Sequence, residues 1–204
     1  VLNQFEKASI IANKCHNYLK NYNGAKYNKL LNDISVEKYF IQFEKVFHSG
    51  LSDNESITNL LDNWLDLDDY KTKLIYPAMR TLYNSREYPK LIKFIKDLKS
   101  EKELPEWLVY DIEHYSALIE IYYHQNKELG KKLLLKCINK LKDQKDNDHL
   151  AVSSRIFTSF GNNFPKEKLT ESLIIKSIEI KEKLSDKPGL ARSYGSLTRM
   201  YFEK

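Results

Sequence analysis

The chain has 204 residues, of which 42% are hydrophobic and 30% charged, and its 33 basic and 28 acidic residues leave a formal net charge of only +5. This balance excludes a disordered chain, and the scarcity of helix breakers, six glycines and five prolines, favours an all-α fold. No apolar run approaches the roughly 20 residues that a membrane-spanning helix needs.

Targeting and redox signals favour the cytoplasm. The first residues lack the charged-then-apolar layout of a signal peptide. Cys15 and Cys137 are far apart in the chain and lie within apolar helical patterns. We therefore expect two buried free thiols in a reducing compartment, with a disulfide as the alternative. The sequence predicts a cytoplasmic protein that makes no membrane contact.

The N-terminal region, residues 1–70, is predicted to be helical. Apolar residues at helical spacing predict a helix over 2–22, and a short helix over 26–33 follows. Ser35 is expected to cap a new helix, which ends at Gly50. This helix carries an aromatic stripe, predicted to be core, made of Tyr39, Phe40, Phe43, Val46 and Phe47.

The next part of the chain is predicted to hold three more helices. One contains Trp64, and the second covers residues 68–84. Pro77 interrupts the second helix, so that either a kink follows or a new helix starts with Pro77 in its first turn. A polar turn over 83–88 then leads to a helix over 91–98.

From Pro105 onward the apolar spacing is most regular and predicts antiparallel helix pairs. Loops of about 3–6 residues force consecutive helices to be antiparallel neighbours. Lys181 lies on an otherwise apolar helix face, and we expect its stem to be buried while its ammonium group reaches solvent. The predicted helices cover residues 105–125, 129–143, 148–161 and 167–184, and another begins at Gly189.

A short motif recurs along this region at nearly fixed spacing. Its copies begin at Ile112, Ala151 and Ala191, which are 39 and 40 residues apart. A period in this range is typical of stacked helical repeats, in which no unit buries its apolar side alone. The copies read Tyr115-x-x-Leu118-Ile119-x-x-Tyr122, Ser154-x-x-Phe157-Thr158-x-x-Gly161 and Tyr194-x-x-Leu197-Thr198-x-x-Tyr201.

The motif resembles the first helix of the tetratricopeptide repeat, W-x-x-L-G-x-x-Y. Pro188 lies where that family places the proline that ends a repeat, and the resemblance covers roughly residues 105–204. It implies a right-handed α-solenoid of antiparallel helix hairpins over 71–204, continuous with the N-terminal part and belonging to a longer chain. Larger residues replace the family's small residue after the leucine, so the helices of a pair should lie farther apart.

The resemblance also implies a binding surface, because this family holds peptides on the concave face formed by the first helices of its pairs. Three arginines there would form a basic strip suited to a carboxylate, since a guanidinium offers a planar fork of donors. The alternative is that these arginines pair with neighbouring side chains in solvent. The residues expected on the concave face are Glu113, Ser116, Glu120, Tyr123, Val152, Arg155, Ser159, Asn162, Arg192, Gly195, Arg199 and Phe202.

Catalytic patterns are absent from the sequence: it has no glycine-rich phosphate loop, nucleophile motif or zinc-protease motif. Glu113, Glu120 and His124 share a helix face, but the second-helix ligand that a metal site needs is not evident. His114 is predicted to lie on a helix surface or in the core. We therefore expect a non-catalytic scaffold for protein–protein interaction, with no cofactor and no metal.

The expected partner is a protein or peptide, or another domain of the same longer chain. Fourteen tyrosines and many lysines leave a nucleic-acid-binding helical repeat as the second hypothesis. The charges alternate in sign along the helices instead of forming a basic block, which favours the protein partner. The third hypothesis is the sensor or regulatory part of a larger enzyme.

Overall fold

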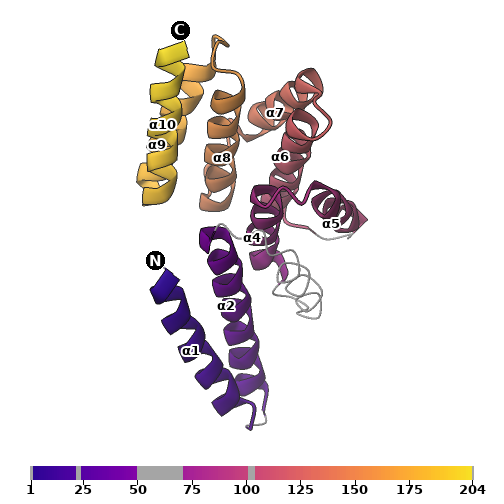
Figure 1. Cartoon of the computed structure of the whole chain (residues 1–204), viewed down its shortest axis with the longest axis vertical. Helices are drawn as coiled ribbons and strands as arrows, with labels where there is room; N and C mark the ends of the chain where they lie inside the picture. The colour runs from indigo at the N-terminus through magenta and orange to yellow at the C-terminus, as the bar shows by residue number, and fades with distance from the viewer. Residues whose placement is uncertain (1, 22–23, 50–70, 101–103, 204) are drawn as a thin grey trace. The chain divides into compact units, whose positions relative to one another are not determined.

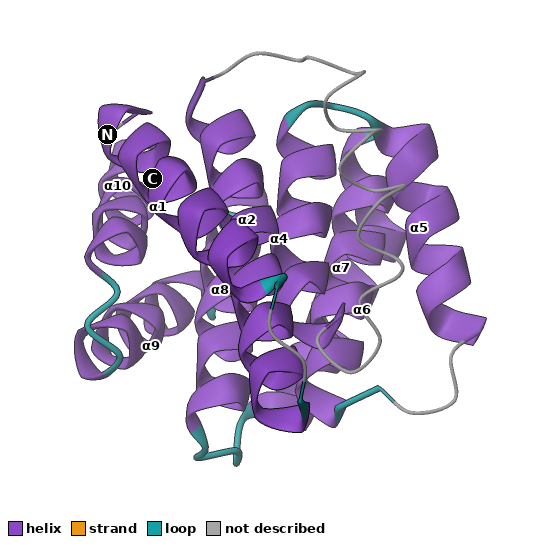
Figure 2. Ribbon diagram, turned by 90° about the horizontal axis from the view of Figure 1, so that it is seen from below, coloured by secondary structure: helices purple, strands orange, loops and turns teal. Residues whose placement is uncertain are grey.

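The structure, a computed structural model, describes residues 2–21, 24–49, 71–100 and 104–203. Every regular element in these ranges is a helix and none is a strand (Figure 2), which confirms the all-α prediction. The chain divides into two compact units, residues 1–102 and 103–204. The boundary predicted near residue 70 and the helix predicted around Trp64 lie outside the described residues.

The first unit begins with two helices that pack against each other, α1 (Leu2–Leu19) and α2 (Ala25–Ser49) (Figure 1). The break predicted before Ser35 is wrong, because α2 is one continuous helix of 25 residues. The Ser35 hydroxyl donates a hydrogen bond to the carbonyl of Leu31 at 2.9 Å. A serine can bond one turn back in this way inside a helix, so its presence does not require a new N-terminus.

Two burial predictions for this hairpin are wrong. Phe43 is buried, but Phe40 of the same stripe is 40% exposed, and the side chains of Val46 and Phe47 lie outside the description. Cys15 is exposed, whereas Cys137 is buried as predicted. Among the described helices α1 packs only against α2, so a large part of its surface stays in contact with solvent.

The first unit continues with α4 (Lys71–Asn84), which packs against α2 and against α5 (Tyr88–Ser100). Pro77 lies in the middle of α4, so the alternative in which it starts a new helix is wrong. Arg80 on α4 donates from Nη2 to both carboxylate oxygens of Glu44 on α2, each at 2.8 Å. The core side of α4 is formed by Leu74, Ile75, Ala78, Met79 and Leu82, all buried.

The second unit follows the predicted helix pattern closely. Side-chain caps fix two of its helix starts: Asn126 accepts a hydrogen bond from Leu129 N, and Asp146 accepts one from His149 N, each at 3.1 Å. Such caps satisfy amide groups that the first helical turn leaves without a partner. The described helices are α6 (Glu106–Tyr122), α7 (Lys127–Leu141), α8 (Asn147–Asn163), α9 (Thr170–Lys183) and α10 (Lys187–Glu203), and their ends agree with the predicted ones to within three residues.

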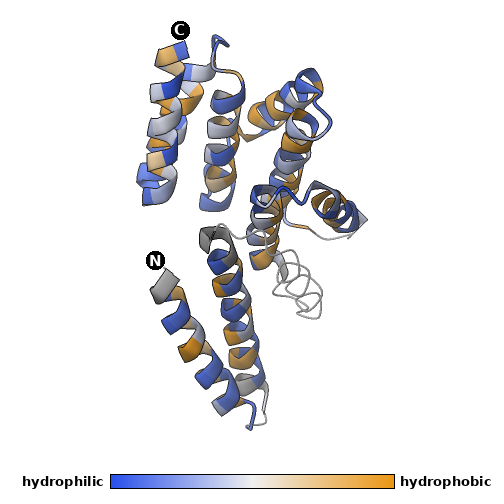
Figure 3. Cartoon of the chain, in the orientation of Figure 1, coloured by the Kyte–Doolittle hydropathy of each residue, from blue (hydrophilic) through white to orange (hydrophobic). Residues whose placement is uncertain are grey.

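Consecutive helices of the second unit pack against each other, and α8 also packs against both α6 and α10. Thus α6 packs against α7 and α8, and α8 packs against α9 and α10. Each of these helices carries both hydrophobic and hydrophilic residues (Figure 3), as expected for helices with one buried and one solvated side. The result is that α6, α8 and α10 are successive neighbours in one row.

The motif positions on α6 and α8 lie mostly in the core. Gly161 faces Ile174 of α9, where an added Cβ would lie 2.6 Å from Ile174 Cγ1. This close approach of two helices explains why the second copy of the motif has glycine where the others have tyrosine. The buried motif residues are Tyr115, Leu118, Ile119, Ser154, Phe157, Thr158 and Gly161.

The third motif copy, on α10, is more exposed than the first two. Tyr194 and Tyr201 are about half exposed, as is Tyr122 at the end of the first copy. α10 packs through the partly buried motif residue Leu197 and through the buried residues that precede three of its motif positions, which are Ser193, Ser196 and Met200.

Candidate functional site

The residues predicted to share a binding surface lie on three neighbouring helices, α6, α8 and α10, or directly after α6. Val152 is the exception to the predicted exposure: it is completely buried, one helical turn before the buried Ile156. Its predicted place on the surface is therefore wrong. The other eleven residues are at least partly exposed and are called the α6–α8–α10 surface: Glu113, Ser116, Glu120, Tyr123, Arg155, Ser159, Asn162, Arg192, Gly195, Arg199 and Phe202.

Arg155 is paired with a buried carboxylate that the sequence reasoning missed. Its Nε and Nη2 donate to Oδ1 and Oδ2 of Asp111, at 3.2 and 2.5 Å. Asp111 is completely buried on α6. Burial raises the pKa of its carboxyl group, and the Arg155 guanidinium opposes that rise. Arg155 therefore ties α8 to α6, and its charge is balanced within the protein.

Next to this pair, His114 and Ser159 form a second polar contact between α6 and α8. His114 Nε2 lies 2.7 Å from Ser159 Oγ, while His114 Nδ1 has no hydrogen-bond partner among the described residues and lies 4.0 Å from Asp111 Oδ1. Burial, helped by the Arg155 charge, lowers the pKa of His114 to about 3.

This serine, histidine and aspartate lack the geometry of a catalytic triad. A triad needs a hydrogen bond between the aspartate and the histidine, which a 4.0 Å separation does not supply. The Asp111 carboxylate is instead bound by Arg155. A histidine whose pKa is lowered to about 3 is also a weak base at neutral pH. The cluster is best explained as a structural link between α6 and α8.

Glu113, predicted to lie on the concave face, is turned toward α7. Its Oε1 accepts a hydrogen bond from Lys136 Nζ at 3.1 Å, and its Oε2 accepts one from the Cys137 thiol at 3.3 Å. Burial, with this hydrogen bond, raises the pKa of Cys137 to about 12, so the thiol is protonated and unreactive. Among the described residues, no three His, Cys, Asp or Glu side chains are grouped so that they could hold a metal ion.

The burial of Lys181 is the least expected feature of the second unit. Only 3% of it is exposed, and its Nζ donates to Thr158 Oγ1 and to Ser193 Oγ, both at 2.7 Å. No ion pair joins it to a carboxylate in the part of the chain that the structure describes. Burial, with the charges of Arg192 and Arg155, lowers the pKa of Lys181 to about 8, while Asp186 acts in the opposite direction.

The prediction that Lys181 reaches solvent is therefore wrong. Its side chain ends among the hydroxyl groups of α8, α9 and α10, where Ser177 Oγ also lies 2.8 Å from Thr158 Oγ1. These hydroxyls offer acceptors that a buried ammonium group needs. The sequence held a signal for this site, because Thr158, Ser177 and Ser193 are polar residues on the mostly apolar, buried sides of their helices.

Two arginines of the predicted basic strip remain exposed on α10. Arg199 Nε donates to Glu203 Oε1 at 2.7 Å, an ion pair within one helical turn that solvent screens. Arg192 forms no ion pair with a carboxylate in the described ranges, and its Nε lies 3.4 Å from the Pro188 carbonyl. Arg192 directly precedes Ser193, whose hydroxyl accepts a hydrogen bond from Lys181 Nζ, and the Arg192 charge lowers the pKa of Lys181.

Two arginines of the predicted basic strip, Arg155 and Arg192, act on the same buried lysine, and the third does not. The charges of Arg192 and Arg155 both lower the pKa of Lys181, whose ammonium group bonds hydroxyl groups of α8 and α10. Arg199 pairs separately with Glu203. Asp111 balances Arg155, which leaves Lys181 and Arg192 with only the partial compensation of Asp186.

Comparison with known proteins adds no assignment to this geometry. None of the described helices has the length and apolar character required to cross a lipid bilayer. No protein-family model, curated protein or solved structure matches this chain.

Proposed function

We propose that this chain is a tetratricopeptide-like α-solenoid that binds an acidic segment of a protein on a concave face formed by α6, α8 and α10. The segment belongs to another protein or to another domain of the same longer chain. Two observations support the architecture: the motif recurs after 39 and 40 residues, and the three helices that carry it are successive neighbours. On this proposal the protein is a non-catalytic scaffold.

The observation that carries the acidic partner is the buried charge of Lys181, which pairs with no carboxylate among the described residues and which Asp186 compensates only in part. A buried ammonium group is costly when no carboxylate pairs with it, and the two hydroxyl groups that accept its hydrogen bonds solvate it without neutralising it. Arg192 adds a second positive charge nearby. A carboxylate that approached Arg192 from solvent would lower the electrostatic energy of both cations, so the folded protein favours an acidic ligand at this place.

The remaining side chains of the surface fit a peptide ligand. Arg199 can exchange its exposed intrahelical partner for a ligand carboxylate, because such screened pairs contribute little to stability. The Asn162 amide can bond a peptide backbone, since it offers both a donor and an acceptor. Tyr123 and Phe202, 47% and 87% exposed, supply aromatic surface for the ligand's apolar side chains.

The test is fluorescence anisotropy with a labelled peptide that contains a run of glutamates. Saturable binding by the wild type is expected, and Arg192→Glu/Arg199→Glu should weaken it by about tenfold or more, because both changes turn attraction into repulsion. The matched control is Lys93→Glu/Lys96→Glu, which reverses two exposed charges on α5. Circular dichroism should show unchanged helix content in both variants.

Two outcomes would contradict the proposal. The first is that the wild type shows no saturable binding of the acidic peptide. The second is that the α5 control loses as much affinity as the α10 variant, because the loss would then follow the total charge of the protein and not this surface.

A further inference from the structure

A second charged surface lies on α7, outside the proposed peptide site. The helix Lys127–Leu141 contains five lysines and one glutamate, which gives it a formal charge of +4, while the whole chain carries +5. Most of the excess positive charge is therefore located on a single helix. The expectation that charges alternate in sign along the helices is wrong for α7, where lysines recur on one side.

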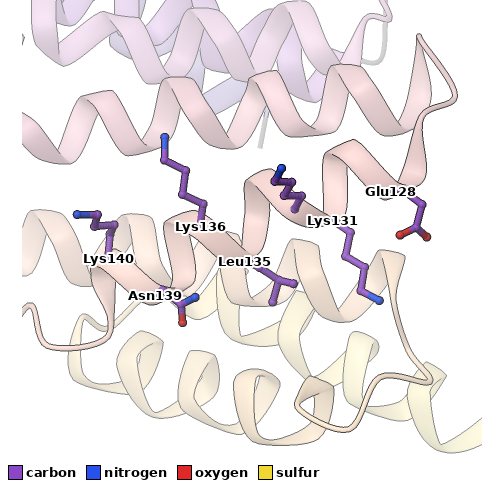
Figure 4. Close-up of a pocket in the computed structure, with 7 residues that line it drawn as sticks. Glu128, Lys131, Leu135, Lys136, Asn139 and Lys140 are labelled. Carbon is purple, nitrogen blue, oxygen red and sulfur yellow. The ribbon is translucent and has the colours of Figure 1, made fainter.

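Four of these five lysines, all except Lys127, line a shallow concavity on the solvent-exposed side of α7 (Figure 4). The opposite side of the helix is packed in the core through residues such as Leu134 and Cys137, both completely buried. Because the lining residues recur at intervals of three and four, they share one helix face. They are Glu128, Lys131, Lys132, Leu135, Lys136, Asn139 and Lys140.

The lysines of this face can accept a new anionic partner. Lys131 pairs with Glu167 at 2.5 Å and Lys136 with Glu113 at 3.1 Å, but the Lys136 side chain is 59% exposed, so solvent weakens that pair. Lys132 and Lys140 are exposed and form no ion pair within the described residues. At four-residue intervals, Lys132, Lys136 and Lys140 rise about 6 Å per step along the helix, and so form a line of charge about 12 Å long.

We propose that the α7 face, defined by these seven residues, binds the sugar–phosphate backbone of a nucleic acid duplex without reading its sequence. Lysine binds phosphate as a compact point charge, whereas arginine suits two-point recognition of base edges or carboxylates. The seven lining residues include no arginine and no aromatic side chain on which an unpaired base could stack. The face therefore matches phosphates and not bases.

Two other anionic partners fit this face less well. A membrane surface is bound by protruding apolar side chains together with lysines, but the only apolar lining residue, Leu135, is partly buried in a concavity. An acidic peptide would gain more from the arginines of the α6–α8–α10 surface, because a guanidinium can bind both carboxylate oxygens.

The experiment measures anisotropy of a labelled, mixed-sequence DNA duplex as salt is raised from about 50 to about 200 mM. The wild type should bind with a log–log salt slope of roughly −3 to −4, which corresponds to contacts with about four phosphates. Lys132→Glu/Lys140→Glu should reduce the magnitude of this slope by about 2, one unit for each lost lysine contact. A second duplex of different sequence should bind equally well.

The control Lys93→Glu/Lys96→Glu changes net charge by the same amount and should keep the wild-type slope. The proposal is overturned if this control lowers binding as much as the α7 variant, or if the wild type does not bind the duplex. A third outcome also overturns it. In that outcome the α7 variant binds the duplex as well as the wild type does, but it has lost the wild type's binding to anionic phospholipid vesicles or to the glutamate peptide. Arg192→Glu/Arg199→Glu reports on the peptide site, so each proposal can fail without the other.

Discussion

Asp111 and Arg155 are 44 residues apart in the chain and form a two-point ion pair between α6 and α8. Because the motif copies on α6 and α8 begin 39 residues apart, Asp111 corresponds to Leu150, and Arg155 lies five residues beyond that position. The pair therefore joins two successive helices of the row through positions that are not equivalent in the motif. It also removes Arg155 from the set of charges that a ligand can neutralise.

Loss of one partner of this ion pair should destabilise the second unit strongly. Arg155→Met leaves the Asp111 carboxylate buried without a counter-charge, and we expect the free energy of unfolding to fall by about 3–5 kcal/mol in urea titrations. The double variant Asp111→Leu/Arg155→Met removes both charges and should be more stable than the single variant. A single variant as stable as the wild type would show that the pair does not hold the helices together.

Mild acid should destabilise the protein through His114. Its pKa is about 3 in the folded chain against an ordinary 6.5, so above pH 6.5 the ring is neutral in both states and stability is full. As the pH falls below 6.5, the unfolded chain takes up the proton first, and stability decreases by roughly 1.4 kcal/mol per pH unit from this group.

Arg155 and Asp111, the other charged groups beside the His114 ring, also affect how much stability is lost in acid. Arg155 disfavours the protonated histidine, while the raised pKa of Asp111 lets that carboxyl group take up a proton in the folded state and so offsets part of the loss at lower pH. Urea midpoints at pH 7 and pH 5 test this, with His114→Gln as the comparison. Equal pH dependence of the variant and the wild type would contradict the assignment to His114.

Two helical glycines should respond in opposite directions to the same substitution. In Gly161→Ala the new Cβ would meet Ile174 Cγ1 at 2.6 Å, so overpacking should lower stability by about 1–3 kcal/mol. In Gly195→Ala the new Cβ meets nothing within 4 Å, and the higher helix propensity of alanine should raise stability by up to about 1 kcal/mol. Thermal unfolding of both variants measures the difference, and a stabilised Gly161→Ala would contradict the close contact of α8 with α9.

The helices of the second unit were predictable from sequence because their signals are local. Caps such as Asn126 and Asp146 and apolar spacing at three and four depend on neighbouring residues alone. Contacts between helices were not predictable in the same way. His114 meets Ser159 across 45 residues and Lys181 meets Thr158 across 23, so their burial depends on how the helices pack. The continuity of α2 through Ser35 was missed because a serine inside a helix carries the same local signal as a cap.

The depressed pKa of Lys181 predicts a stability change in alkali. The unfolded lysine keeps its proton up to a pKa of 10.5, whereas the folded one loses it at about 8. Between these values the unfolded state binds more protons, so stability should rise with pH, by up to about 3 kcal/mol. The charges of Arg192 and Arg155 lower the pKa of Lys181 in addition to burial, and the charge of Asp186 raises it. Urea titrations of the wild type and Lys181→Met at pH 7.5 and about 10 check this, and the variant should lack the rise. A rise of equal size in both proteins would contradict it.

The affinity of Lys181→Met for the labelled glutamate peptide tests the account's central claim most directly. Lys181 itself is buried, so its replacement by a residue of similar length removes the buried charge while leaving the exposed side chains of the α6–α8–α10 surface in place. We predict that the variant is at least as stable as the wild type at pH 7 and binds the peptide about tenfold more weakly. A folded variant that binds the peptide with wild-type affinity would contradict the claim that this buried charge selects an acidic partner.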